Sequence, residues 1–232
     1  MTAGGKKPLG RYFAEFIVVF IGVALAFTVE NLREDMNDRA VGDQYLAGFA
    51  EDLRADLVML DEQLELRRDQ LKRARIVLEY YSGMSVGPQQ FFSAYYPMLV
   101  SHDTLPNRNT MDEVLSSGSL RLIGDPEIRS GLLGLYASYD RIARQEAHMA
   151  RDFDVYLYDP TFSSVRFQLE GPWDDSPENQ AAVQALLSDL RVENGVRLIP
   201  ANLELAGEGL LPELERARAQ VEQLLALLPA DP

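Results

Sequence analysis

Apolar residues recur at steps of three and four positions over long parts of the chain, which is the spacing of one face of an α-helix. The longest such seam runs from Leu46 to Tyr81, and charged residues occupy the other faces of this segment. No stretch after residue 30 alternates apolar and polar residues with the period of two that a half-buried strand shows. The pattern therefore predicts an all-α protein whose helices pack through apolar seams. The seam positions are Leu46, Phe49, Leu53, Leu57, Leu60, Leu64, Leu71, Ala74, Leu78 and Tyr81.

Glycine and proline residues divide the first half of the chain into helices. Gly42 and Asp43 are the expected kink or cap between an N-terminal helix and the seam helix, which we expect to stop at Ser82-Gly83. If the seam helix is continuous with the preceding segment, it extends unbroken from Glu30. Gly87-Pro88 then opens a short helix that Pro97 is expected to end.

Capping patterns mark the helices in the middle of the chain. Thr110 and Glu113 form a capping-box pattern ahead of a short helix, which SSGSLRLIG is expected to break. Asp125-Pro126 combines a cap with proline at the first helical position and predicts a second long helix that extends to Tyr158. Pro160 is the expected end of that helix.

Two further helices are predicted near the C-terminus. Ser176 caps a helix that reaches about Leu190, and the stretch from Ala201 to Leu228 is helical in pattern, with Pro212 as a kink or a break. Three long amphipathic helices and several shorter ones, joined by short loops, indicate an antiparallel helical bundle.

An apolar segment near the N-terminus indicates a membrane span. Residues 12–29 contain Glu15 as their one charged residue, and as a helix they are about 27 Å long, close to the hydrocarbon thickness of a bilayer. A short apolar run of this kind also fits the central region of a signal peptide. The apolar run continues directly into the helical pattern ENLREDMNDRA, which contains no small-x-small cleavage site, and this favours an uncleaved single-pass helix.

Charges on either side of the span indicate its orientation. Lys6, Lys7 and Arg11 precede it, whereas the segment that follows is mainly acidic. Because lysine and arginine are retained on the cytoplasmic side, we expect a cytoplasmic N-terminus at residues 1–11, a transmembrane helix at 12–29 and a periplasmic bundle at 30–232. The expected location is the cytoplasmic (inner) membrane of a bacterium.

Small residues within the span predict a face that contacts another helix. Gly22 and Ala26 are four positions apart, a spacing that lets a second transmembrane helix approach closely. Glu15 has two interpretations: an interfacial carboxylate one turn from Arg11, or a contact with a partner helix inside the bilayer.

The composition limits the chemistry that the chain can perform. It has no cysteine, which excludes disulfides, thiolate metal sites and cysteine nucleophiles. Its net charge of -14 makes nucleic acid a poor partner. The two histidines, His102 and His148, lack the spacing of a metal site, and no nucleophile elbow or phosphate-binding loop is present. We therefore expect no catalytic residue, no cofactor and no bound metal.

One basic cluster stands out in this acidic chain, and it has two interpretations. It could pair with acids of the same helix, namely Glu62, Glu65, Asp69 and Glu79. Alternatively, it could form an extracytoplasmic docking surface for an acidic partner. The cluster consists of Arg67, Arg68, Lys72, Arg73 and Arg75.

An aromatic patch on the short helix after Pro88 also has two interpretations. It either packs on the bundle or anchors a partner. It consists of Phe91, Phe92, Tyr95 and Tyr96.

Two stretches resemble an uncharacterised family of bacterial single-pass membrane proteins. The first comprises Glu15, VVFIGVALAF, Glu30-Asn31-Leu32 and Glu34, followed by DQYLAGFAEDLRADLVMLDEQL. The second is the phrase NTMDEVLSSGSLRLI at 109–123. The chain departs from the family at Leu32, where tryptophan is common. The resemblance implies an N-terminal transmembrane helix and a helical extracytoplasmic domain, and it brings no catalytic residues.

These features favour a non-enzymatic role. We expect a membrane-anchored accessory or scaffold subunit whose partners are the lipid bilayer and other transmembrane subunits of a larger complex. One such host is an electron-transfer assembly, either photosynthetic or respiratory. This expectation is based on the general shape of the subunits in such assemblies, and no residue of the chain indicates it. The alternative is a helical-bundle sensor that binds a small ligand. Such a sensor would signal through a partner, because a cytoplasmic side of about eleven residues is too small for an output domain.

Overall fold

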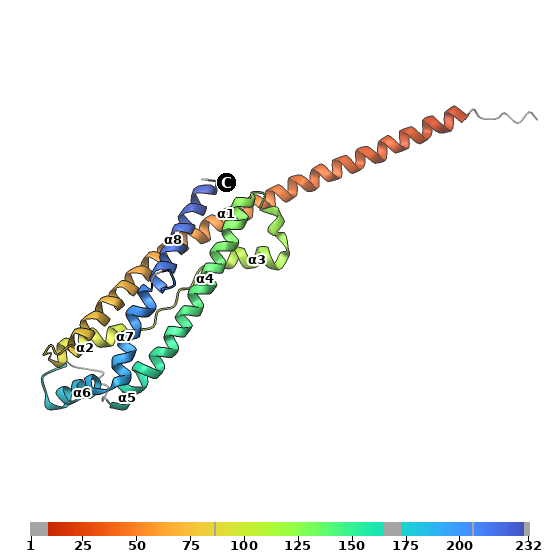
Figure 1. Cartoon of the computed structure of the whole chain (residues 1–232). Coiled ribbons are helices and arrows are strands. Elements are labelled where there is room, and N and C mark those ends of the chain that lie inside the picture. The colour runs from red at the N-terminus through yellow and green to blue at the C-terminus, as the bar shows by residue number, and fades with distance from the viewer. Residues whose placement is uncertain (1–8, 86, 165–172, 206, 230–232) are drawn as a thin grey trace, which may run out of the picture.

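The chain folds into a bundle of helices from which one long helix projects (Figure 1). The computed structural model describes residues 9–85, 87–164, 173–205 and 207–229. Within these ranges every regular element is helical, which confirms the predicted all-α fold. Lys6 and Lys7, used above to orient the span, lie outside the described residues.

Helix α1, Leu9–Tyr81, continues without interruption through the expected kink at Gly42 and Asp43. Gly42 has a packing role instead, because a Cβ atom there would lie 2.6 Å from the carbonyl oxygen of Leu122. The helix ends where expected, at Ser82 and at Gly83, whose φ of 95° suits glycine. With 73 residues it is about 110 Å long.

Helix α2, Pro88–Leu99, continues past Pro97, which was expected to end it. Proline cannot donate a hydrogen bond to the carbonyl of the residue four positions earlier, here Ser93. Arg73 of α1 supplies the missing donor, with its Nη1 2.9 Å from the Ser93 oxygen. A tertiary contact thus stabilises the last turn of α2.

The aromatic patch of α2 packs on the bundle, which was one of its two interpretations. Phe91, Phe92 and Tyr95 are almost fully buried. The ring of Trp173 lies 3.9 Å from that of Phe92, measured between centroids. The patch therefore belongs to the core.

Helix α3, Asn109–Ser117, is capped differently from the prediction. The Thr110–Glu113 capping box is absent, and the Thr110 amide donates instead to Asp52 of α1 at 3.0 Å. Gly118, with φ 68°, then ends α3 and leads into the 3₁₀ segment η1, Ser119–Leu122.

Helix α4, Pro126–Phe153, begins as predicted, with the Asp125 side chain accepting from two backbone amides. A π-helical segment, η2 (Asp154–Tyr158), connects it to α5, Asp159–Ser164. Pro160 therefore does not end the helix. It stands in the first turn of α5, where a missing amide hydrogen is tolerated.

The C-terminal helices are α6 (Pro177–Ser188), α7 (Leu190–Glu204) and α8 (Leu210–Leu227). Ser176 caps α6 as predicted. The break between the last two helices comes before Gly209 rather than at Pro212, which lies in the first turn of α8. Gly209 is required there because a Cβ atom would lie 2.7 Å from the Leu203 carbonyl oxygen.

The bundle is antiparallel. The part of α1 beyond Gly42 and the whole of α4 point away from the projecting end, and α7 and α8 return between them (Figure 1). Helix α1 packs against α2, α7 and α8, and α4 packs against α8. The projecting end of α1 is free of these contacts.

Candidate functional site

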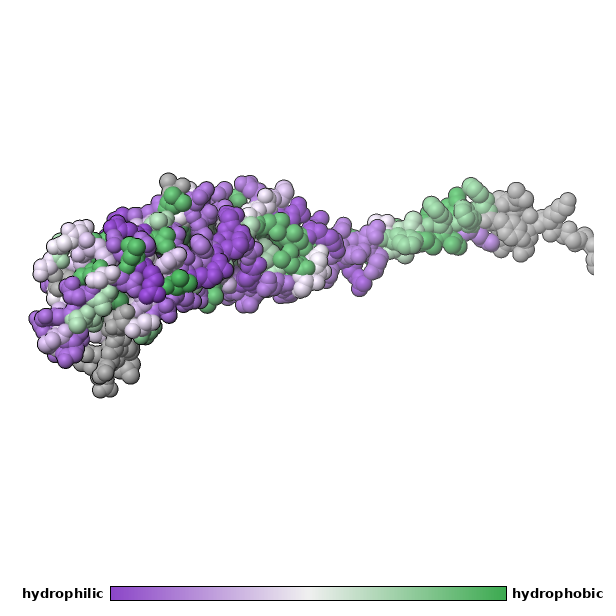
Figure 2. All heavy atoms as spheres, turned by 60° about the horizontal axis from the view of Figure 1, so that its bottom comes forward, coloured by the Kyte–Doolittle hydropathy of each residue, from purple (hydrophilic) through white to green (hydrophobic). Residues whose placement is uncertain are grey.

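The projecting part of α1 exposes one continuous apolar surface (Figure 2). Phe13 and the apolar residues from Phe16 to Val29 are exposed, and this stretch is long and apolar enough to cross a membrane. A signal sequence near an N-terminus meets the same criterion. Gly22, Ala26 and Glu15, the predicted partner contacts, all lie on this part of α1 and are exposed.

A polar connector separates this apolar surface from the bundle. Residues 30–37 are exposed on every side of the helix, and an ion pair joins Arg33 to Glu30 at 2.9 Å. The first contacts with the bundle are an ion pair of 2.9 Å between Asp38 and Arg121 of η1, and the close packing of Gly42 on Leu122. The bundle therefore stands away from the end of the apolar segment.

The structure corrects the prediction for Arg67. Its side chain is only 3% exposed, so Arg67 does not form part of a docking surface. Its Nη2 donates to Glu146 of α4 at 2.9 Å, and its Nη1 donates to Gln70 at 3.2 Å. The same Nη2 also contacts the backbone oxygen of His102. Arg67 thus anchors the loop after α2 inside the bundle.

Three other members of the basic cluster form ion pairs within the chain. Arg73 pairs along α1, as one interpretation proposed, but Arg68 and Arg75 pair with acids of other helices. Lys72 is exposed and makes no ion pair with the described part of the chain. The partners are Asp69 for Arg73 at 2.5 Å, Glu215 of α8 for Arg68 at 2.8 Å and Glu204 of α7 for Arg75 at 2.7 Å.

Glu146 is the acceptor that connects Arg67 to the loop. Besides Arg67, it accepts from the Thr104 amide at 3.0 Å and from the Thr104 hydroxyl at 2.7 Å. Gln70 extends the network by donating to the Met98 oxygen at 2.8 Å. Burial, together with the nearby Arg67 charge, lowers the pKa of His102.

A second buried network surrounds Asp56 of α1, which is only 1% exposed. Its carboxylate accepts from the Asn107 amide at 2.7 Å and from the Tyr139 hydroxyl of α4 at 2.8 Å. Tyr136 donates in turn to the Asn107 oxygen at 3.0 Å. Desolvation raises the pKa of Asp56, and the neighbouring Asp52 raises it further.

Together these networks fasten the loop between α2 and α3, residues 100–108, to α1 and α4. Asp56 and Glu146 were not among the functional residues expected from the sequence. A signal was present for Asp56, because it occupies the apolar side of α1 between Leu53 and Leu60. Arg67 shares this feature, standing between Leu64 and Leu71. A charged residue within an apolar seam indicates a buried polar partner.

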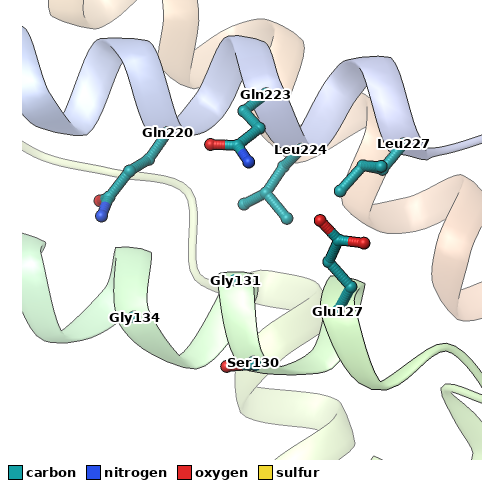
Figure 3. Close-up of a pocket in the computed structure, with 8 residues that line it drawn as sticks. All are labelled: Glu127, Ser130, Gly131, Gly134, Gln220, Gln223, Leu224 and Leu227. Carbon is teal, nitrogen blue, oxygen red and sulfur yellow. The ribbon is translucent and has the colours of Figure 1, made fainter.

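A cavity of about 320 Å³ lies between α4 and α8 (Figure 3). Gly131 and Gly134 form its α4 wall, and a Cβ atom on Gly131 would lie 2.7 Å from a methyl carbon of Leu224. The polar side chains at its border are those of Glu127, Ser130, Gln220 and Gln223. They do not form a nucleophile–base pair, so the cavity gives no indication of catalysis.

His148 does not take part in a metal site among the residues that the structure describes. It is largely exposed and lies 3.7 Å from Asp152, one turn along α4. No group of three or more histidine, cysteine, aspartate or glutamate residues able to hold a metal ion occurs in the described ranges. Comparison of the chain with protein-family models, curated proteins and solved structures gives no match.

Proposed function

We propose that the protein is a non-catalytic accessory or scaffold subunit, anchored in a bacterial cytoplasmic membrane by residues 12–29. Its bundle stands in the periplasm, and its span contacts other transmembrane subunits of a larger complex. The single observation that carries the proposal is the continuity of α1 from Leu9 to Tyr81. The apolar segment and the longest core helix of the bundle are one rod.

Continuity favours an anchor over a cleaved signal peptide. The connector at residues 30–37 is helical and is followed directly by the bundle contacts of Asp38 and Gly42. Residues 30–42 are helical throughout, so this region offers a peptidase no extended segment to bind. Mass spectrometry of the mature protein tests this point, since a chain that starts after Val29 would contradict the anchor.

The expected partner contact is the face of Gly22 and Ala26. In lipid, helix pairing has no hydrophobic driving force, so close approach at small residues provides the attraction. A Cβ atom on Gly22 meets no other atom within 4 Å, so the described part of the chain leaves this face open. The exposed members of the basic cluster, including Lys72, supply a polar contact with an acidic partner.

Purification in mild detergent tests the proposal. We expect the wild-type protein to elute in a complex, and Gly22→Leu to release it while its helical content and thermal unfolding stay unchanged. Ala24→Leu, on the opposite face of the same span, is the matched control. Recovery of the wild-type protein as a lone monomer would contradict the proposal. The expectation of an electron-transfer host stays a prediction.

A ligand-binding sensor is the second candidate, and the cavity between α4 and α8 is the observation that favours it. Its volume, about 320 Å³, is at the small end of the range of ligand pockets. A ligand held there would raise the unfolding temperature of the wild-type protein. Gly134→Leu, which fills the cavity from a position with open space around it, would abolish that rise. The absence of any shift across a panel of metabolites would remove this candidate.

A further inference from the structure

The exposed apolar surface of α1 contains a seam with a strict heptad spacing. Its residues follow one another at alternating steps of four and three, the repeat of helices that wind around each other. Five of the six seam residues carry large side chains, and each of these five residues is 60–69% exposed. The seam consists of Val18, Gly22, Leu25, Val29, Leu32 and Met36.

The seam extends beyond the span into water. Leu32 and Met36 lie in the polar connector and are 60% and 63% exposed. Lipid covers apolar side chains within the bilayer, but these two lie after the apolar segment, among charged residues. Exposed apolar residues aligned with a transmembrane face indicate a partner helix that also continues out of the membrane.

The same heptad positions are already used within the bundle. Leu53, Leu60 and Leu64 continue the register of the seam, and the chain's own helices bury them almost completely. Arg39 and Asp43 interrupt the seam between the two parts. The chain therefore provides packing partners for the part of this register beyond Asp43, and its described residues provide none for the part from Val18 to Met36.

We propose that this seam pairs α1 with α1 of a second copy of the chain, as a parallel two-stranded coiled coil that begins in the membrane and ends at Met36. The proposal rests on the membrane-anchored function above and names the partner of the same helix face. Both copies insert with the same orientation, so their helices are parallel. Gly22 allows close contact within the lipid, and Leu32 and Met36 become buried outside it.

The residues of the seam favour two strands and an identical partner. Val29 is β-branched at one heptad position, and Leu25 and Leu32 occupy the other, a combination that favours parallel dimers. The flanking charges also tolerate a second copy. Between Val18 and Met36, the positions beside the seam place no like charges opposite each other, because in the parallel register Arg33 faces Thr28 of the other copy and Asp35 faces Ala40.

The absence of cysteine makes disulfide cross-linking a direct test, because each variant carries a single thiol. We expect full-length Leu32→Cys, oxidised in native membranes, to form a disulfide-linked species of twice the 26.0 kDa chain mass. Glu34→Cys, equally exposed but on the outer face, is the matched control and should form this species at least about ten times more slowly. Met36→Cys and Asn37→Cys form a second such pair.

The outcomes separate this proposal from the previous one. Equal cross-linking of Leu32→Cys and Glu34→Cys would overturn the pairing with a second copy. If a larger complex then still purifies in mild detergent and Gly22→Leu still releases it, the accessory function stands and its partner is a different helix. If the wild-type protein purifies as a monomer and neither thiol cross-links, both proposals fail. Circular dichroism of each variant confirms that the helices are retained.

Discussion

Arg67 of α1 and Glu146 of α4 form an ion pair of 2.9 Å in which both side chains are at most 6% exposed. Glu146 simultaneously accepts two hydrogen bonds from Thr104. A charge removed from water in this way is tolerated only while its partners remain, so loss of either residue leaves an uncompensated buried charge. The pair is therefore central to one of the two buried networks that hold the loop between α2 and α3 on the bundle.

We predict that Glu146→Gln lowers the free energy of unfolding by about 3–5 kcal/mol. The matched control is Arg68→Met, which removes the exposed pair with Glu215 and should cost less than about 1 kcal/mol. Urea unfolding of the full chain in mild detergent, followed by circular dichroism, measures both. A double variant, Arg67→Met with Glu146→Gln, removes both charges while the glutamine oxygen can still accept from Thr104, so it should recover part of the loss. Equal costs for the buried and exposed pairs would contradict the prediction.

Asp56 should make the stability of the bundle depend on pH in an unusual direction. Because its pKa is raised in the folded state from an ordinary value of 3.8, its contribution is fully present below pH 3.8. That contribution is lost as the pH rises through the folded pKa. Relative to Asp56→Asn, the wild-type protein should therefore lose stability as the pH rises from 3.8 toward neutral.

Unfolding curves of the wild-type protein and of Asp56→Asn over this pH range give the free energy of unfolding of each. The difference between the two values reports on Asp56, because the contributions of the other titrating groups cancel. The groups that face the carboxyl are the Tyr139 hydroxyl, the Asn107 amide and Asp52. The exposed Asp35→Asn variant serves as the control. A difference that does not change with pH would show that burial of Asp56 leaves its ionisation unaltered.

Gly42→Ala should destabilise the bundle although alanine is the better helix former. The new Cβ atom would lie 2.6 Å from the Leu122 oxygen, so η1 must move away from α1. We expect a net cost of about 1–3 kcal/mol. Gly22→Ala, with open space around it, is the control and should leave thermal unfolding of the bundle unchanged. An increase in stability for Gly42→Ala would mean that helix propensity outweighs the steric contact.

Arg73 and Pro97 should be energetically coupled. Arg73 donates to the Ser93 oxygen because Pro97 lacks the amide hydrogen that would otherwise do so. We expect Arg73→Met to cost about 0.5–1.5 kcal/mol in the wild-type chain and less in a Pro97→Ala background, where an amide donor is restored. A double-mutant cycle by urea unfolding measures the coupling, and a coupling of zero would contradict this account.

Features encoded by neighbouring residues were predictable from the sequence. The cap of α4 at Asp125 and that of α6 at Ser176 follow from a side chain and an amide two or three residues away, and both are confirmed. Helix ends that depend on other helices were not predictable. Proline at 97 was expected to end α2, but Arg73, more than twenty residues away in the chain, stabilises that turn.

The buried polar networks were missed for the same reason. The partners of Asp56 come from Asn107 and Tyr139, and spacing along α1 does not reveal them. The basic cluster illustrates the converse. The five clustered cations had two interpretations, pairing along α1 or a docking surface, but the fold buries Arg67 and pairs Arg68 with α8. Proximity in sequence indicated the charge density, whereas packing determined which charges remain accessible.

On the proposed membrane anchoring, the unbroken rod of α1 also acts as a lever whose fulcrum lies in the bilayer. From Glu30 to Tyr81 it measures about 75 Å, with no joint at which a change of angle could be absorbed. A transmembrane helix adjusts its tilt to the thickness of the surrounding lipid. A thicker or thinner membrane would therefore swing α2 and α6, at the far tip, through an arc several times larger than the movement within the lipid.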